Sequence, residues 1–126
     1  MRSIQEKSRK SINSDLQEEL TKSIQGEVRF DDISRQMYST DGSIYSILPV
    51  GVTIPANSDD VSTIIEICNK NNVAILPRGG GTSLSGQTVN SAVVIDFSKY
   101  MNKIIEINSD EKWVHKHCAE DTLDLP

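Results

Sequence analysis

The sequence has 126 residues, of which 37% are hydrophobic and 25% charged, and 18 acidic against 13 basic residues give a net charge of −5. This length suits one small domain, and the composition excludes a collagen-like, disulfide-rich or low-complexity protein. An acidic chain without a basic stripe is also a poor nucleic-acid binder, because phosphate contacts dominate that affinity.

The cysteines and the hydropathy pattern indicate the cellular compartment and the solubility of such a chain. Cys68 and Cys118 are too few for a disulfide framework and lack the spacing of a metal site, which favours a reducing, cytoplasmic setting. No apolar run approaches the roughly 20 residues that cross a bilayer, so we expect a soluble protein.

Residues 1–46 are predicted to form a helical and loop-rich N-terminal segment. A helix is expected to begin near Asn13 or Ser14 and to end at Gly26. Apolar residues recur every four positions along one narrow stripe of this helix: Ile12, Leu16, Leu20 and Ile24. The narrow stripe favours a surface helix over a partner-binding one.

A second short helix is predicted over 31–39, with Ile33 and Met37 one turn apart. The stretch 39–46 is dense in hydroxyl side chains around Asp41-Gly42. Such side chains bond to the local backbone, so this stretch favours turns.

Residues 50–76 have the pattern of a strand–helix–strand unit. Alternating apolar residues predict a strand over 50–54, and a helix capped by Asn57 or Ser58 follows. One face of this helix is apolar: Val61, Ile64, Ile65 and Cys68. The short apolar run 73–76 predicts a buried strand.

Three further strands are predicted over 92–97, 103–108 and 112–116, and the tight turn at 109–111 predicts that the last two form a hairpin. The predicted fold class is α+β: a helical lead-in, a βαβ unit and a β-meander.

One loop carries the chemistry. Four of the seven glycines fall within Leu76–Gln87, LPRGGGTSLSGQ, directly after a predicted strand. Consecutive glycines permit positive φ and remove every Cβ that would hold a ligand away. Amide N–H groups can then converge on an anion, with hydroxyl donors and the charge of Arg78 beside them. We interpret the loop as a diphosphate site; the alternative is a flexible turn whose glycines only relieve strain.

Three familiar motifs each fail at one residue of this loop. A Walker A loop would need a lysine where Gln87 stands, which disfavours a nucleotide triphosphatase. A dinucleotide fingerprint would need a third glycine in place of Leu84, and a nucleophile elbow a glycine in place of Ser85.

Three stretches resemble one family instead: PRGGGTSLSGQ at 77–87, YSTDGSIY at 38–45 and VIDFSKYMN at 94–102. Together they are similar to the FAD-binding domain of the FAD-linked oxidases related to vanillyl-alcohol oxidase and p-cresol methylhydroxylase (PCMH). Within this family they look most like the D-2-hydroxyacid dehydrogenase branch, notably the long members with a C-terminal iron–sulfur domain. The resemblance covers about residues 35–115 and implies a PCMH-type fold.

The resemblance implies that this loop holds the pyrophosphate of FAD. The implied cofactor-binding residues are Arg78, Gly79, Gly80, Gly81, Thr82, Ser83, Gly86 and Gln87. Relatives that attach flavin covalently have a histidine after the glycines, so Thr82 implies noncovalent binding. The branch oxidises acids of the D-lactate or D-2-hydroxyglutarate type by hydride transfer to the flavin.

The chain departs from the family pattern after His115, where relatives continue into a Pro-Gly turn. We therefore expect residues 47–116 to be a partial FAD-binding domain and 117–126 an atypical tail, from a truncation or a frame change. His115, His117 and Cys118 have no fourth partner, which disfavours a metal site. An iron–sulfur cluster would belong to a missing C-terminal part.

No base or cation cluster for a hydroxy-acid substrate is recognisable in the sequence. We assign no catalytic residue and expect the chain alone to be inactive, to bind FAD weakly and to be prone to aggregation. Two alternatives stay open: a stand-alone nucleotide- or anion-binding module, and a non-functional remnant.

Overall fold

The computed structural model describes the backbone of residues 2–116 and the side chains of residues 13–116. It contains three helices: α1 (Arg2–Ser23), α2 (Asp32–Met37) and α3 (Ser58–Lys70). Its strands are β1 (Glu27–Arg29), β2 (Gly51–Ile54), β3 (Ile75–Arg78), β4 (Val93–Asp96), β5 (Ile104–Asn108) and β6 (Trp113–Lys116). No helix among these residues is long and apolar enough to cross a membrane.

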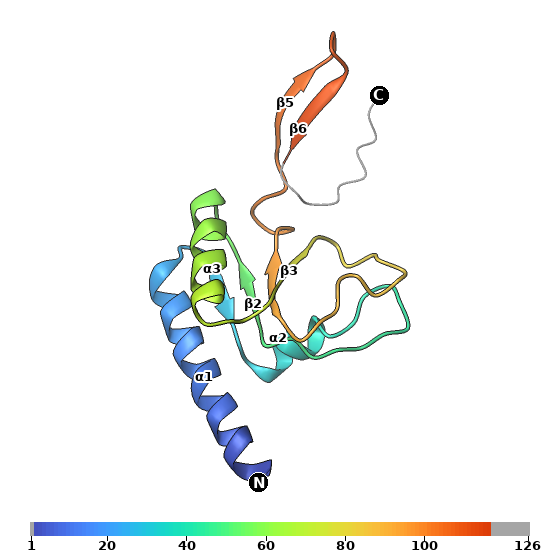
Figure 1. Cartoon of the computed structure of the whole chain (residues 1–126). Coiled ribbons are helices and arrows are strands. Elements are labelled where there is room, and N and C mark those ends of the chain that lie inside the picture. Colours follow the sequence, from blue (N-terminus) through green and yellow to red (C-terminus); the bar gives the residue numbers. More distant parts are fainter. Residues whose placement is uncertain (1, 117–126) are drawn as a thin grey trace.

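Four strands form one sheet in the order β1-β2-β4-β3. β2, β4 and β3 run parallel, and β1 pairs antiparallel with β2. α1 and α3 lie side by side along this sheet (Figure 1). The main core joins these two helices to the sheet and to the turn after β4, with nine buried members: Leu16, Leu20, Ile64, Ile67, Cys68, Val93, Ile95, Phe97 and Met101.

The α+β fold class and the strand–helix–strand unit β2–α3–β3 are confirmed. The prediction that residues 92–97 continue into a meander is wrong, because β4 inserts between β2 and β3 and runs parallel to both. All four residues of β4 are buried. A continuous apolar run without alternation is typical of a central parallel strand, which is covered on both faces.

The prediction of a buried strand over 73–76 is also corrected. β3 begins two residues later and lies at the edge of the sheet, with Ile75 and Pro77 exposed. The shift arises at the end of α3, where Asn72 adopts φ 52° and the N–H of Val73 donates to the carbonyl of Cys68 at 2.9 Å. This helix-ending turn occupies the first part of the predicted strand.

Of the two helix caps that the sequence predicted, the one at Asn57 is confirmed and the one near Asn13 or Ser14 is wrong; the cap of α2 at Asp31 is a finding of the structure. Asn57 caps α3 by accepting the N–H of Asp60 at 2.9 Å, and Asp31 caps α2 by accepting the N–H of Ser34 at 2.8 Å. α1 instead begins at Arg2, well before the predicted start, because no glycine or proline interrupts the preceding residues.

Two further predictions concern the short helix over 31–39 and the hairpin at the end of the chain. The short helix is confirmed as α2. Its side chains Ile33 and Met37 are both exposed, so they add nothing to the core. β5 and β6 form the predicted antiparallel hairpin, which projects away from the four-stranded sheet (Figure 1). Its large apolar side chains are exposed.

Candidate functional site

The glycine-rich loop leaves the carboxyl end of β3, and Asp96 stands at the carboxyl end of neighbouring β4. Ligands of open α/β sheets bind at this end of the strands. The loop lies beside the chain that follows α2, as the two neighbouring loops in Figure 1 show. We call residues 38–45 of that chain the brace.

Two glycines of the loop adopt backbone conformations that other residues rarely take. Gly81 has φ 70° and Gly86 has φ 77°. The expectation that the loop uses positive φ is therefore confirmed at these two positions. Gly79 and Gly80 are not among the positive-φ residues of the described chain.

Arg78 binds the backbone on both sides of the loop. Its Nη1 donates to the carbonyls of Thr88 at 3.0 Å and Tyr38 at 3.3 Å, and its Nη2 donates to the carbonyl of Thr40 at 2.8 Å. The guanidinium also lies over the Tyr38 ring, 5.2 Å from its centroid. Arg78 thus holds the brace and the far end of the loop together, a role that sequence reasoning missed.

Tyr38 connects the brace to the end of β4. Its hydroxyl donates to the buried carboxylate of Asp96, whose other oxygen accepts the N–H of Ser98 at 2.8 Å. Desolvation, together with the hydrogen bond to Asp96, raises the pKa of Tyr38. The phenol therefore stays protonated and donates at neutral pH.

Asp41 connects the brace to the last part of the loop. One carboxylate oxygen accepts the hydroxyl of Thr88 at 2.9 Å and its N–H at 3.4 Å, and the other accepts the N–H of Ser43 at 2.8 Å. The hydrogen bonds from Ser43, followed by those from Thr88, lower the pKa of Asp41 to about 2. The carboxylate is therefore ionised and occupied by donors of the protein.

Glycines also allow the brace and the loop to approach closely. The N–H of Gly42 donates to the carbonyl of Gly81 at 3.0 Å, and a Cβ on Gly42 would lie 3.0 Å from the carbonyl oxygen of Ser83. A Cβ on Gly86 would lie 2.6 Å from the Tyr45 ring. The sequence indicated turns at 39–46; the Asp-Gly pair among hydroxyls was the only local signal of this contact.

Ser83 organises the tip of the loop. Its hydroxyl donates to the side-chain oxygen of Gln87 and lies within reach of the N–H groups of Ser85 and Gln87, at 3.4 and 3.3 Å. Two amides thus point at one oxygen. Leu84, which lies between Ser83 and Ser85 in the sequence, is 81% exposed.

The predicted cofactor-binding residues belong to one continuous loop, and the structure places this loop at the carboxyl ends of the parallel strands. The segment 78–87 contains no acidic side chain, and the carboxylate of Asp41 already accepts protein donors. Backbone amides, hydroxyls and left-handed glycines suit an oxygen-rich anion such as a pyrophosphate. His117 and Cys118 of the disfavoured metal site lie outside the described residues.

Comparison with known proteins gives three kinds of match. A family model described as "FAD binding domain" matches residues 49–125. D-2-hydroxyglutarate dehydrogenase of Pseudomonas putida is 38% identical over 92 residues, which are 71% of this chain and 9% of that protein. The glycolate oxidase subunit GlcD of Bacillus subtilis is 36% identical over 119 residues, which are 90% of this chain and 25% of that protein.

A solved structure of 4-ethylphenol oxidase from Gulosibacter chungangensis shares the fold with a TM-score of 0.62 at 22% identity. The match covers 78% of this chain and 20% of that one. The chain thus spans a quarter or less of each of these relatives. The sequence match extends over more than half of the chain and includes the glycine-rich loop, so the chain belongs to the FAD-binding domain family.

Proposed function

We propose that residues 78–87 bind the pyrophosphate of FAD noncovalently, as part of an oxidoreductase that acts on D-2-hydroxy acids such as D-lactate or D-2-hydroxyglutarate. The observation that carries the proposal is the glycine loop at the carboxyl end of β3, with Gly81 and Gly86 held in left-handed conformations. Membership of the FAD-binding family supports the cofactor, and the name of the relative from Pseudomonas putida supports the substrate class.

Each group of the loop has a proposed role. Amides from Gly79 to Ser83 donate to the phosphate oxygens, and the hydroxyl of Thr82 adds a donor, while the hydroxyl of Ser83 shapes the loop through Gln87. Gly86 and Gln87 close the far side, and Arg78 shapes the loop through the three carbonyls that it binds. Thr82 has no nucleophilic nitrogen that would form the covalent flavin bond of histidine-bearing relatives.

The redox chemistry belongs to the flavin, which accepts a hydride from the hydroxy acid when it is bound. In this proposal the loop 78–87 forms the cradle that holds the pyrophosphate. The described residues contain no recognisable acid–base pair for the substrate. We therefore propose that catalysis needs parts of a longer protein and that the 126-residue chain alone has no dehydrogenase activity. Residues 47–116 form the cofactor-binding part in this proposal, residues 1–46 the N-terminal segment and 117–126 the atypical tail.

Titration of the purified chain with FAD and with ADP tests the cofactor. We expect weak, saturable binding that is tighter for FAD than for ADP. Calorimetry measures both affinities, and flavin fluorescence measures that for FAD. Equal affinity for both ligands would favour a stand-alone nucleotide- or anion-binding module, and no binding of either would favour the remnant.

Two matched loop variants make the test specific. Gly80→Val places a side chain in the proposed cradle and should abolish FAD binding. Leu84→Ala removes an exposed side chain from the same loop and should leave binding unchanged. If both variants bind FAD like the original chain, the loop is not the site.

A further inference from the structure

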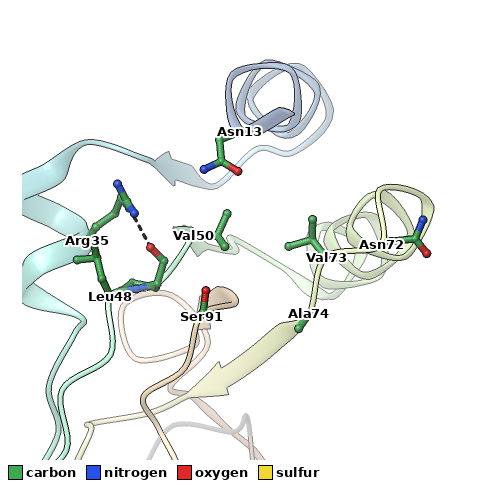
Figure 2. A pocket seen from close by; sticks show the side chains of 9 residues that line it. Asn13, Arg35, Leu48, Val50, Asn72, Val73, Ala74 and Ser91 are labelled. Atoms are coloured by element: carbon green, nitrogen blue, oxygen red, sulfur yellow. Dashed lines mark hydrogen bonds between the residues drawn. The ribbon is translucent and has the colours of Figure 1, made fainter. Parts of the chain in front are cut away.

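A cavity of about 500 Å³ lies at the amino-terminal ends of the parallel strands (Figure 2). The glycine loop lies at the other end of these strands, their carboxyl ends. It is lined by Asn13 of α1, Arg35 of α2, residues 48–50 before β2, residues 72–74 before β3 and Ser91 before β4. Five segments that are distant in the sequence thus meet around one space. This space belongs to no part of the FAD site proposed above.

A second cavity of about 280 Å³ adjoins the first and shares Asn13, Arg35 and Val50 with it. Its remaining lining residues are Ser14, Gln17 and Phe30. The two together form a trough beneath α1, with Arg35 at the point where they meet. In Figure 2 the side chains of Asn13 and Ser91 point into this space from opposite sides.

The one charged side chain that lines the trough, among the described residues, is a cation, in a chain with a net charge of −5. No aspartate or glutamate is among the described residues that line either cavity, and Arg35 is their one charged group. The other polar lining groups are amides and hydroxyls, which can donate hydrogen bonds. An anion is therefore the charged ligand that this lining accepts.

Arg35 is held in place for such a role. Its Nε donates to the carbonyl of Pro49 at 2.9 Å, and its side chain is only 23% exposed. Its ion pair is with Asp32, at 3.2 Å from Nη1, but Asp32 is 98% exposed. An ion pair with a fully solvated carboxylate is weak, so a carboxylate inside the trough can replace it.

We propose that this trough binds a small organic carboxylate with an apolar body. The carboxylate pairs with the Arg35 guanidinium, whose planar fork matches two carboxylate oxygens. Asn13 and Ser91 offer further hydrogen bonds, and Leu48, Val50 and Val73 provide an apolar wall for the body of the ligand. The site is independent of FAD and of the glycine loop.

Hexanoate is a suitable probe, and hexanamide is its uncharged counterpart of nearly equal shape. Binding is followed on the full 126-residue chain by two-dimensional NMR, through the backbone amides of Val50 and Ser91 and the indole of Trp113 on the distant hairpin. We expect saturable shifts at Val50 and Ser91 with hexanoate, none at Trp113, and at least tenfold weaker binding of hexanamide. Equal binding of both probes, or no saturable shift with hexanoate, would overturn the proposal.

Three variants locate the site. Arg35→Gln should weaken hexanoate binding at least tenfold, whereas Arg29→Gln, which removes a surface arginine outside the trough, should not change it. Ser91→Leu fills the cavity and leaves Arg35 intact, so it should also abolish binding. If Arg35→Gln does not fold, Ser91→Leu decides, and unchanged hexanoate affinity in that variant contradicts the proposed site.

Discussion

The guanidinium of Arg78 lies directly against the α-carbon of Gly81. A Cβ at Gly81 would stand 2.5 Å from Nη2, closer than side chains approach in proteins. The guanidinium occupies this place because residue 81 has no side chain, and a Cβ there would force it to move. One glycine serves both the left-handed turn of the loop and the arginine that holds the loop in place.

Gly81→Ala should therefore disturb the loop more than the same change elsewhere in it. A left-handed conformation costs a non-glycine residue about 1–2 kcal/mol, and the Arg78 contacts must also shift. We expect a loss of at least this size in the free energy of unfolding, measured with urea, and weaker FAD binding. Gly80→Ala, at a position without positive φ, is the matched control for stability and should lower the free energy of unfolding by less. Equal losses of unfolding free energy in the two variants would contradict the argument.

Asp60→Asn should strongly destabilise the junction between α1 and α3. The buried Asp60 carboxylate accepts three backbone N–H groups, from Gln25 at 2.9 Å, Gly26 at 2.8 Å and Ala56 at 2.9 Å. An asparagine turns an NH₂ group toward one of these donors, so we expect a loss of about 2–3 kcal/mol in urea unfolding.

Asp59→Asn is the control for this change, because Asp59 is exposed in the same first turn of α3. It should change stability by less than about 0.5 kcal/mol. A similar loss in both variants would mean that helix-end charge, and not the buried contacts, is responsible.

Stability should fall between pH 4 and pH 2 in part through Asp41. Its pKa is lowered in the folded chain to about 2, below its usual value, so its contribution is present above pH 4 and disappears as the pH falls through the folded pKa. Glu27 titrates in the same range, since hydrogen bonds from Lys99, Tyr100 and Arg29 lower its pKa to about 2.

The Asp41 contribution is isolated by comparing variants. Asp41→Asn should show a smaller loss of stability from pH 4 to pH 2 than the original chain, in urea unfolding followed by circular dichroism. An identical pH dependence in the two proteins would mean that the contacts of Asp41 with Thr88 and Ser43 do not stabilise the ionised form.

Cys68 should be unreactive in the folded chain. It is a buried free thiol in the main core, and burial raises its pKa to about 11. In a Cys118→Ser background, a thiol reagent at pH 8 should modify Cys68 slowly, and rapidly in urea. Equal rates in both conditions would show that the core around α3 opens readily.

Much of the local structure could be predicted because it depends on short-range rules. The Asn57 cap and the apolar face of α3 follow from helix geometry, and the β5–β6 hairpin follows from the turn between two strand-like runs. Of the face predicted for α3, Ile64 and Cys68 are buried, while Ile65 remains exposed at its border.

The order of the strands could not be predicted in the same way. The placement of β4 between β2 and β3 depends on which strands can satisfy each other's backbone groups. The run 92–97 indicates burial on both faces, but it does not say which neighbours provide it. The exposed edge position of β3 follows from the same pairing.

The amino-acid sequence by itself determined that a glycine-rich, acid-free loop follows a strand, because backbone freedom and missing side chains are properties of single residues. The tertiary structure alone decided that the brace supports this loop, through Arg78 on three carbonyls and Asp41 on Thr88. It also decided that Arg35 lines a trough at the far edge of the sheet. The contacts of Arg78 and Asp41 join residues that are 10 to 47 positions apart in the sequence, and only packing of the whole chain brings such residues within hydrogen-bonding distance.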